Sequence, residues 1–358
     1  MKRYLAFALA AALLMAACPA SANQWNLRGG LYMALDQPGV ADVYDGYAAG
    51  DGSQADFGQS WSVAVLYSGL KQHHLLLLGQ KEQGAWRVAL TAAKAARQAD
   101  NWNLPKVSAW GEGGFSLAWP DAEYRFLEAA EGGGFALYEA TLGNLAFVWD
   151  ERNQGYLVTS GSDTALWLLP RLSLSDFNEA LFPRTMAEAM ALSAAYERLS
   201  GLPFSHRRVH AIAEKVQATV PVYAAPSDKA YRAGKGKAAV GLMGPVWAEA
   251  RDGDWLLVRY DISLKAGRVG YMAADAYSGL PEPLYPLDDK DAPALRLTLP
   301  RAAAVTMDPA VGQATEMTLA AGTALTVFGL YDPFYAYVGF LTADGLSSRG
   351  CVRLIDLM

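Results

Sequence analysis

The feature that most constrains the fold is a repeat in the last third of the chain. The segment "WLLVRYDISLKAGRVGYMAADAY" matches "YAYVGFLTADGLSSRGCVRLIDL", so that Val258 corresponds to Val338 and Gly270 to Gly350. The valine and the glycine have the same spacing in both copies. Each copy spans about 65 residues and reads as short apolar runs between polar turns. The repeat therefore predicts two small and similar β-rich modules.

Both copies resemble bacterial SH3-like modules. The first copy has "VPVYAAP", "DWLLVRY" and "RVGYM" where that family has its opening, central and final strands. The second copy is degenerate, with Tyr335 in place of the tryptophan and Cys351 in place of the final aromatic. The resemblance covers residues 213–358 and implies a small five-stranded barrel for each module. We place the first module at 206–280 and the second at 290–358.

The region before the modules has the pattern of a β-meander. Between Ser60 and Pro170, short apolar runs alternate with turns rich in Gly, Asp, Asn and Gln. Several runs have period two; for example, Leu145, Phe147 and Trp149 share one face. A lone sheet would leave an apolar face in water, so the pattern predicts a sandwich or a barrel-like fold.

A helix is predicted to close this first domain. Thr185 stands three residues before Glu188, which is the spacing of a capping box. A helix over 186–199 is predicted in a domain that spans 23–205, because one set of residues recurs at helical spacing and shares one face. These residues are Met186, Ala189, Met190, Ser193, Tyr196 and Leu199. The predicted fold class is therefore mainly β: an N-terminal antiparallel meander domain with a closing helix, followed by two small SH3-like barrels.

The first residues have the pattern of an export signal. Lys2 and Arg3 precede an apolar run that is too short to span a bilayer and ends at "CPASA". We expect a signal peptide over 1–22 and secretion, with lipid anchoring through Cys18 as the alternative. Both readings place the protein outside the cytoplasm, and no other segment predicts a transmembrane helix. Loss of the two cations changes the formal charge from −6 to −8, which disfavours nucleic acid as a partner.

Cys351 lies in a segment that resembles the S-H-G-C-[IV]-R nucleophile motif of the L,D-transpeptidases. Arg349 stands where that family has histidine, and no histidine follows His210. The repeat aligns Cys351 with Tyr271, and a buried free cysteine behaves as a small hydrophobe. We therefore expect Cys351 to be inert, and we predict no catalytic residue.

Other polar clusters have weak patterns for metal sites. His73 and His74 are adjacent, so on a strand their side chains would point to opposite faces. His206 and His210 are four residues apart, but no further ligand follows at a suitable spacing. Calcium could bind an acidic, glycine-rich stretch in which the spacing does not fit an EF-hand. The carboxylates of that stretch are Asp42, Asp45, Asp51 and Asp56. We predict no metal and no cofactor.

The candidate ligand-binding residues lie in the two modules. SH3-like barrels commonly bind extended peptides in aromatic-lined grooves. The candidate aromatic residues are Tyr223, Trp247, Tyr260, Tyr271, Tyr331 and Tyr337. A basic loop in the first module could bind an anionic polymer. Its charged residues are Lys229, Arg232, Lys235 and Lys237.

The sequence thus predicts an exported, non-enzymatic recognition protein of the cell envelope. Its partner would be a cell-wall peptide or an envelope protein, and the oligomeric state is left open. One alternative is a wall-targeted enzyme with its active site in the N-terminal β domain. Another is a structural protein whose modules pack internally.

Overall fold

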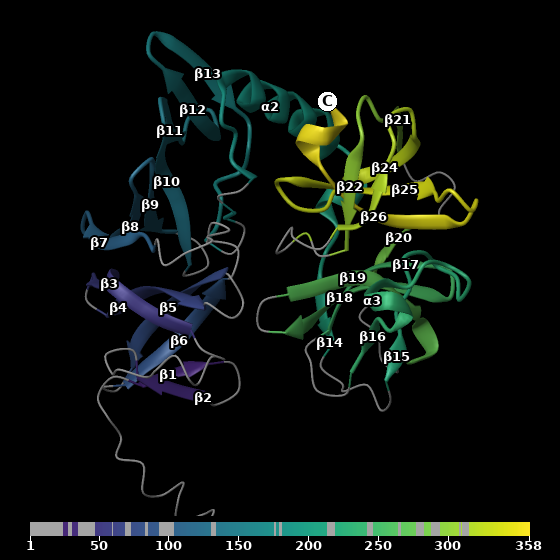
Figure 1. Cartoon of the computed structure of the whole chain (residues 1–358), viewed down its shortest axis with the longest axis horizontal. Coiled ribbons are helices and arrows are strands. Elements are labelled where there is room, and N and C mark those ends of the chain that lie inside the picture. The colour runs from purple at the N-terminus through teal and green to yellow at the C-terminus, as the bar shows by residue number, and fades with distance from the viewer. Residues whose placement is uncertain are drawn as a thin grey trace, which may run out of the picture. The chain divides into compact units, whose positions relative to one another are not determined.

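The computed structural model is mainly β, with mostly antiparallel pairing (Figure 1). It describes residues 24–27, 31–34, 47–58, 60–68, 73–82, 85–92, 104–129, 134–174, 177–178, 181–212, 219–241, 246–263, 266–276, 283–287, 294–307, 309 and 315–358. The predicted leader with Cys18, as well as Asp42 and Asp45, lies outside these residues. The chain divides into two compact units, and the division falls inside strand β8 (Gly114–Trp119).

The first unit contains the strands that precede β8. Strands β3 to β6 form a four-stranded sheet in sequence order, and β1 pairs with β2. Phe57 and Phe115 meet in this unit with their ring centroids 5.0 Å apart. Its strands are β1 (Gln24–Leu27), β2 (Leu31–Ala34), β3 (Tyr47–Phe57), β4 (Trp61–Ser68), β5 (His73–Glu82), β6 (Ala85–Ala92) and β7 (Lys106–Trp110).

The second unit begins with the remainder of the meander. Its strands pair with their neighbours in sequence order, as the alternating runs predicted. Leu145, Phe147 and Trp149 are all buried on one face, which confirms their predicted period. Phe147 and Trp167 pack edge to face in this core. The strands are β9 (Ala122–Glu128), β10 (Phe135–Leu142), β11 (Leu145–Asp150), β12 (Gly155–Ser160) and β13 (Asp163–Trp167).

The predicted helix is present as α2 (Met186–Ser200). The Thr185 side chain accepts a hydrogen bond from the Glu188 N–H at 3.2 Å, which satisfies one of the free donors at the helix start. The buried face includes Leu192 and Leu199. Met190, predicted to lie on that face, is 58% exposed. The helix is rich in alanine, so its apolar side chains define the buried face only weakly.

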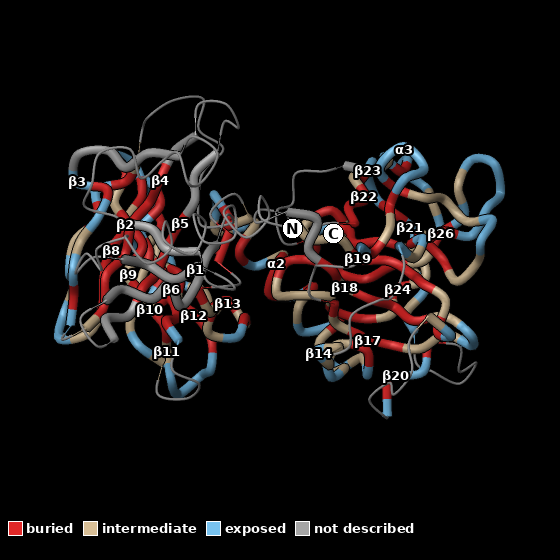
Figure 2. The backbone as a smooth tube through the Cα atoms, turned by 90° about the horizontal axis from the view of Figure 1, so that it is seen from below, coloured by how far each residue is buried: buried red, intermediate tan, exposed pale blue. Residues whose placement is uncertain are grey.

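The C-terminal strands form open sheets that are strongly buried in their centres (Figure 2). One sheet has the order β14-β17-β18-β19, and the other has the order β21-β24-β25-β26-β22-β23. The longer strands are β14 (His210–Ile212), β17 (Val246–Asp252), β18 (Trp255–Ser263), β19 (Ala266–Ala273), β21 (Leu295–Thr298), β22 (Ala303–Thr306), β23 (Thr315–Leu319), β24 (Ala324–Leu330), β25 (Tyr335–Leu341) and β26 (Ser347–Arg353). The shorter elements are η3 (Pro203–His206), β15 (Val220–Pro221), α3 (Ala233–Gly236), β16 (Ala239–Val240), η4 (Ala274–Ala276), β20 (Tyr285–Pro286) and η5 (Leu354–Leu357).

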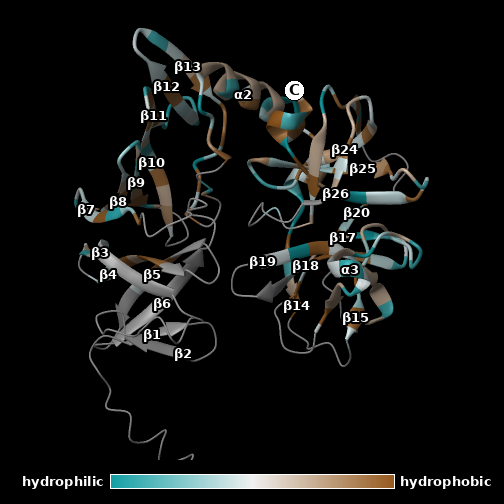
Figure 3. Ribbon diagram, viewed as in Figure 1, coloured by the Kyte–Doolittle hydropathy of each residue, from teal (hydrophilic) through white to brown (hydrophobic). Residues whose placement is uncertain are grey.

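Neither of these two sheets closes into a barrel among the strands that the structure describes. The predicted closed form is therefore not observed, whereas the predicted antiparallel β class is. Figure 3 shows hydrophobic residues in the strands of both sheets. In the first module one core cluster includes Leu256, Val258 and Met272, and Leu257 and Tyr271 are buried on the opposite face of the sheet.

Candidate functional site

The repeat is visible in the strand pairing of the two modules. In the first module, Val258 pairs with Gly270 between β18 and β19. In the second module, Val338 pairs with Gly350 between β25 and β26. Each module also has an earlier strand, β14 or β21, that pairs with the third strand from the end, and each ends in a short 3-10 helix. The two copies can therefore be compared residue by residue.

The two matched glycines perform the same packing task. A Cβ atom on Gly270 would lie 2.5 Å from Cγ1 of Val222. A Cβ atom on Gly350 would likewise lie 2.5 Å from Cγ1 of Val305. Both distances are too short for real atoms, so a side chain is excluded at each position. This close approach explains why the repeat has glycine at both positions.

The two modules contact each other through a reciprocal pair of backbone hydrogen bonds. The Val269 N–H donates to the Met307 carbonyl at 2.7 Å. The Arg349 N–H donates to the Ala224 carbonyl at 2.9 Å. Val269 and Arg349 are equivalent in the repeat, since each precedes its matched glycine. The modules thus associate as an approximate two-fold pair, with each one using the same strand to contact its neighbour.

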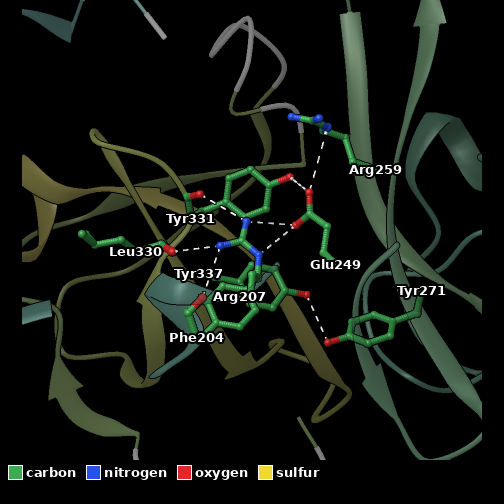
Figure 4. Close-up of polar contacts among 8 residues, drawn as sticks. All are labelled: Phe204, Arg207, Glu249, Arg259, Tyr271, Leu330, Tyr331 and Tyr337. Carbon is green, nitrogen blue, oxygen red and sulfur yellow. Dashed lines mark hydrogen bonds and ion pairs between the residues drawn. The ribbon is translucent and has the colours of Figure 1, made fainter. Parts of the chain in front are cut away.

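A buried ion pair lies between the modules (Figure 4). The guanidinium of Arg207 donates to Oε2 of Glu249 at 3.0 Å, and the two side chains are only 6% and 1% exposed. The Tyr331 hydroxyl donates to Oε1 of the same carboxylate at 2.8 Å. The guanidinium also donates to the carbonyls of Leu330 and Tyr331, both at 3.2 Å. Carboxylate and carbonyl oxygens therefore surround the cation, and the hydroxyl holds the carboxylate.

The environment of this network shifts the pKa values of its titrating groups. Burial disfavours the charged form of Arg207, but the adjacent Glu249 carboxylate outweighs it and raises the pKa of the arginine. Burial raises the pKa of the Tyr331 hydroxyl well above its ordinary value, and the charge of Glu249 raises it further. Both effects keep the phenol neutral and the ion pair intact near neutral pH.

A second polar cluster involves Arg349, the residue that replaces the histidine of the transpeptidase motif. Its guanidinium forms an ion pair with the Asp252 carboxylate at 2.6 Å and donates to the Tyr271 hydroxyl at 2.5 Å. The Tyr337 hydroxyl lies 3.3 Å from that of Tyr271, and its ring stacks on Phe204 at 5.1 Å. Burial raises the pKa of Tyr271 to about 12. The cluster joins the two modules and fixes the direction of the arginine.

The structure places several predicted ligand-binding residues in the interior. Tyr260, Tyr271 and Tyr337 are buried, with at most 2% exposure, so they do not line an open groove. Tyr331 is half-buried, and its hydroxyl belongs to the ion-pair network. Tyr223 is half-buried against Trp255, with an interplanar angle of 90°. These aromatic side chains serve mainly as core and as contacts between modules.

The predicted basic loop is largely exposed. Lys229, Lys235 and Lys237 are all exposed, with α3 in the middle of the loop. Arg232 differs, because its Nε donates to the Ala238 carbonyl at 2.8 Å and its guanidinium lies 5.7 Å from the Tyr223 ring. The arginine thus holds the loop in place, while the lysines face solvent.

Trp247, the remaining predicted residue, belongs to a row of residues that pair directly across the first module. The row runs from Ala211 to Trp247, to Arg259 and to Val269. Directly paired residues point to the same face of a sheet. The Arg259 guanidinium lies 4.8 Å from the half-buried Trp247 ring, so these two side chains cover the middle of the row.

The equivalent row in the second module has different residues. It runs from Arg296 to Thr326, to Gly339 and to Arg349 across β21, β24, β25 and β26. A groove with a volume of about 650 Å³ lies over it. The lining residues are Arg296, Leu297, Thr298, Thr323, Ala324, Leu325, Thr326, Phe328, Gly339, Phe340, Leu341, Ser347 and Arg349.

The comparison of the modules explains why the groove exists. Thr326 stands where the first module has Trp247, and Gly339 stands where it has Arg259. The two large side chains that cover the first row are therefore replaced by the small threonine side chain and a hydrogen atom. The Phe328 ring borders the gap, because a Cβ on Gly339 would lie 3.2 Å from its Cε2 atom.

Both modules have a β-bulge at the same place, and the extra residue is different in each module. The pairing shifts between Ala248 and Ala250 in β17, which leaves Glu249 as the extra residue. It shifts between Val327 and Gly329 in β24, which leaves Phe328 as the extra residue. Bulges often redirect a side chain at a functional site. Here one bulge supplies the buried carboxylate, and the other supplies an aromatic wall of the groove.

Sequence reasoning did not find the groove residues, although a signal for them was present. The repeat alignment sets Gly339 against Arg259, which indicates a smaller residue in the second copy. The match of Thr326 with Trp247 becomes visible only in the strand pairing. Phe328 could not be placed in this way, because a bulge is not visible in the alternation of apolar residues. Arg349 was treated only as a departure from the transpeptidase motif.

The other candidates for catalysis or metal binding are dispersed. Cys351 is fully buried and pairs with Tyr337 across the sheet. His206 lies in η3 and is exposed, whereas His210 begins β14. The side chains of His73 and His74 lie outside the described residues. Within the described ranges, no group of three or more His, Cys, Asp or Glu side chains is arranged to hold a metal ion. None of the helices described has the length and apolarity needed to span a bilayer.

Comparisons with known proteins give no family for this chain. No protein-family model matches it, and no curated protein matches it. It is similar to the crystal structure of a protein from Lactobacillus plantarum, a structural genomics target, with 11% identity and a TM-score of 0.21. That match covers 86% of this chain and 72% of the other. A similarity at this level carries no argument, so the chemistry of the site alone supports a function.

Proposed function

We propose that this chain is an exported recognition protein of the cell envelope, and that its second module binds an extended peptide. The observation that carries the proposal is the groove over Gly339. Two copies of one module pair with each other, and the second is hollow where the first is covered. A hollow made by replacing Trp and Arg with Thr and Gly is a specific difference between otherwise equivalent surfaces.

The groove has the chemistry that a peptide ligand requires. Phe328 and Leu341 offer apolar contact, and Leu341 is 66% exposed. Thr298, Thr326 and Ser347 add hydroxyl groups that can donate to or accept from a peptide backbone. The resemblance to SH3-like modules favours an extended peptide, and the predicted leader favours a ligand in the cell envelope.

The test uses the full chain and purified bacterial cell walls in a co-sedimentation assay. Thr326→Trp copies the residue of the first module and should fill the groove, which would reduce binding at least tenfold. Thr318→Trp is the matched control, because Thr318 is exposed on β23, at the opposite end of the sheet order. Gly339→Arg is a second filling variant, in case Thr326→Trp does not fold.

Equal binding by the filled and control variants would contradict the proposal. Absence of binding to walls and to peptides released from them would favour the structural alternative. That alternative has its own support in the contacts between modules and in Phe334, whose ring lies 6.3 Å from that of Trp167 in the meander. In the structural reading the modules brace the meander and bind nothing.

A further inference from the structure

We propose that the groove of the second module selects acidic peptides, and that Arg296 is the residue that makes this selection. The inference rests on the proposed function, since it names the ligand class of the same groove. Among the residues that the structure describes, those that line the groove include Arg296 and Arg349 but no aspartate and no glutamate. The whole chain has a formal charge of −6, so the groove is a local exception in sign. An anionic ligand would thus be attracted to this surface more than to its surroundings.

The two arginines do different tasks. The charge of Arg349 is already balanced by Asp252, and its guanidinium is held against the Phe328 ring at 4.8 Å. This stacked pair forms a rigid wall rather than a free charge. Arg296 is exposed on β21 at the start of the row. The ligand's acidic group is therefore recognised at Arg296, whose guanidinium can donate two parallel hydrogen bonds to one carboxylate.

The spacing of the row predicts a sequence pattern in the ligand. Adjacent strands lie about 4.8 Å apart, so the Arg296 and Gly339 backbones are about 10 Å apart across two strand steps. In an extended peptide, side chains on one face recur about every 7 Å. An acidic residue that reaches the long Arg296 side chain thus places the residue two positions away over Gly339, beside Phe328. The preferred ligand has an acidic residue and an apolar residue separated by one residue.

The test measures the binding of labelled peptides to the full chain by fluorescence anisotropy. One peptide repeats Glu-Ser-Val-Ser twice, and the other repeats Lys-Ser-Val-Ser twice. The acidic peptide should bind at least tenfold more tightly than the basic one at low salt, and the preference should shrink as salt screens the charge. Arg296→Glu should lower affinity for the acidic peptide about tenfold and raise affinity for the basic peptide, because the charge at the rim is reversed.

Lys229→Glu is the matched control, since it makes the same charge change in the basic loop of the first module. It should change either affinity less than twofold. If Lys229→Glu rather than Arg296→Glu abolishes the preference, the basic loop selects the ligand and the inference is wrong. A polyphosphate chain serves as a further probe. Equally tight binding of polyphosphate at the groove would indicate a general anion site and would also overturn the inference.

The outcomes separate this inference from the proposed function. Suppose that both peptides bind equally and that Thr326→Trp abolishes both. The groove is then a peptide site without charge selection, so only the inference fails. If neither peptide binds, and cell walls do not bind either, the proposed function itself fails.

Discussion

Removal of the buried negative charge of Glu249 should be the most damaging single change between the two modules. In Glu249→Gln the side chain keeps its shape, and its amide oxygen can still accept from the Tyr331 hydroxyl. What is lost is the charge that balances Arg207. Because Arg207 is only 6% exposed, its cation would stay buried without a counter-charge.

The size of the expected loss of stability depends on the hydrogen bonds that Arg207 keeps in the variant. Breaking a buried pair by removing one partner costs about 3–5 kcal/mol. Arg207 keeps its hydrogen bonds to the Leu330 and Tyr331 carbonyls, which partly solvate it. We therefore expect a loss near the lower limit, about 3 kcal/mol. Glu151→Gln is the control, because Glu151 is 70% exposed and its ion pair with Arg171 contributes little.

The assay is urea-dependent hydrogen exchange, read at strands β17 and β24 so that the modules are observed separately from the meander. A double-mutant cycle with Arg207→Met completes the test. Once the cation is gone, Glu249→Gln should cost little, so the two changes should be coupled by about 2 kcal/mol or more. Additive effects, or a Glu249→Gln variant as stable as Glu151→Gln, would refute the reasoning.

Two further predictions concern stability. The pKa of Tyr271 is raised to about 12 by burial, whereas tyrosine in an unfolded chain ionises near pH 10. The neutral Tyr271 phenol thus contributes fully to the free energy of unfolding below pH 10. This contribution is lost as the pH rises from 10 to 12, where each pH unit increases the unfolding equilibrium constant about tenfold. The free energy of unfolding, measured with urea at several pH values, should fall less steeply between pH 10 and 12 in Tyr271→Phe than in the parent protein. An unchanged dependence on pH would count against the buried phenol. Gly270→Ala should cost about 1–3 kcal/mol by overpacking against Val222, whereas Gly241→Ala, with open space around it, should be near neutral in thermal unfolding. Equal melting temperatures for these two variants would contradict the close approach.

Much of the fold could be predicted from the alternation of apolar and polar residues along strands and from the capping residue of the helix. The meander strands follow the period-two runs, and α2 begins at the predicted Thr185 cap. Both signals depend only on residues that are close in sequence, so they do not depend on contacts with distant parts of the chain. The face of α2 was predicted less well, since Met190 is exposed while Leu192 is buried. A helix rich in alanine takes its orientation from what it packs against, and that partner is distant in sequence.

The candidate site was harder to predict, because it depends on how the modules pair. Aromatic residues such as Tyr271 and Tyr337 suggested a groove, but both are buried in the structure. Arg207 and Glu249 showed no sequence signal, since a bulge and a contact between modules bring them together. The groove itself depends on a difference between copies, at Gly339 above all. The sequence repeat contains that difference, but whether it leaves an open groove depends on tertiary packing.

The central claim is that ligand binds to the second module and not to its equivalent in the first. It is tested most directly by hydrogen exchange of the full chain with and without the Glu-Ser-Val-Ser peptide. Bound peptide should slow exchange in β21, β24 and β25 around Gly339, and leave β14, β17 and β18 of the first module unchanged. Protection confined to the first module, or to its basic loop around Lys229, would contradict the account.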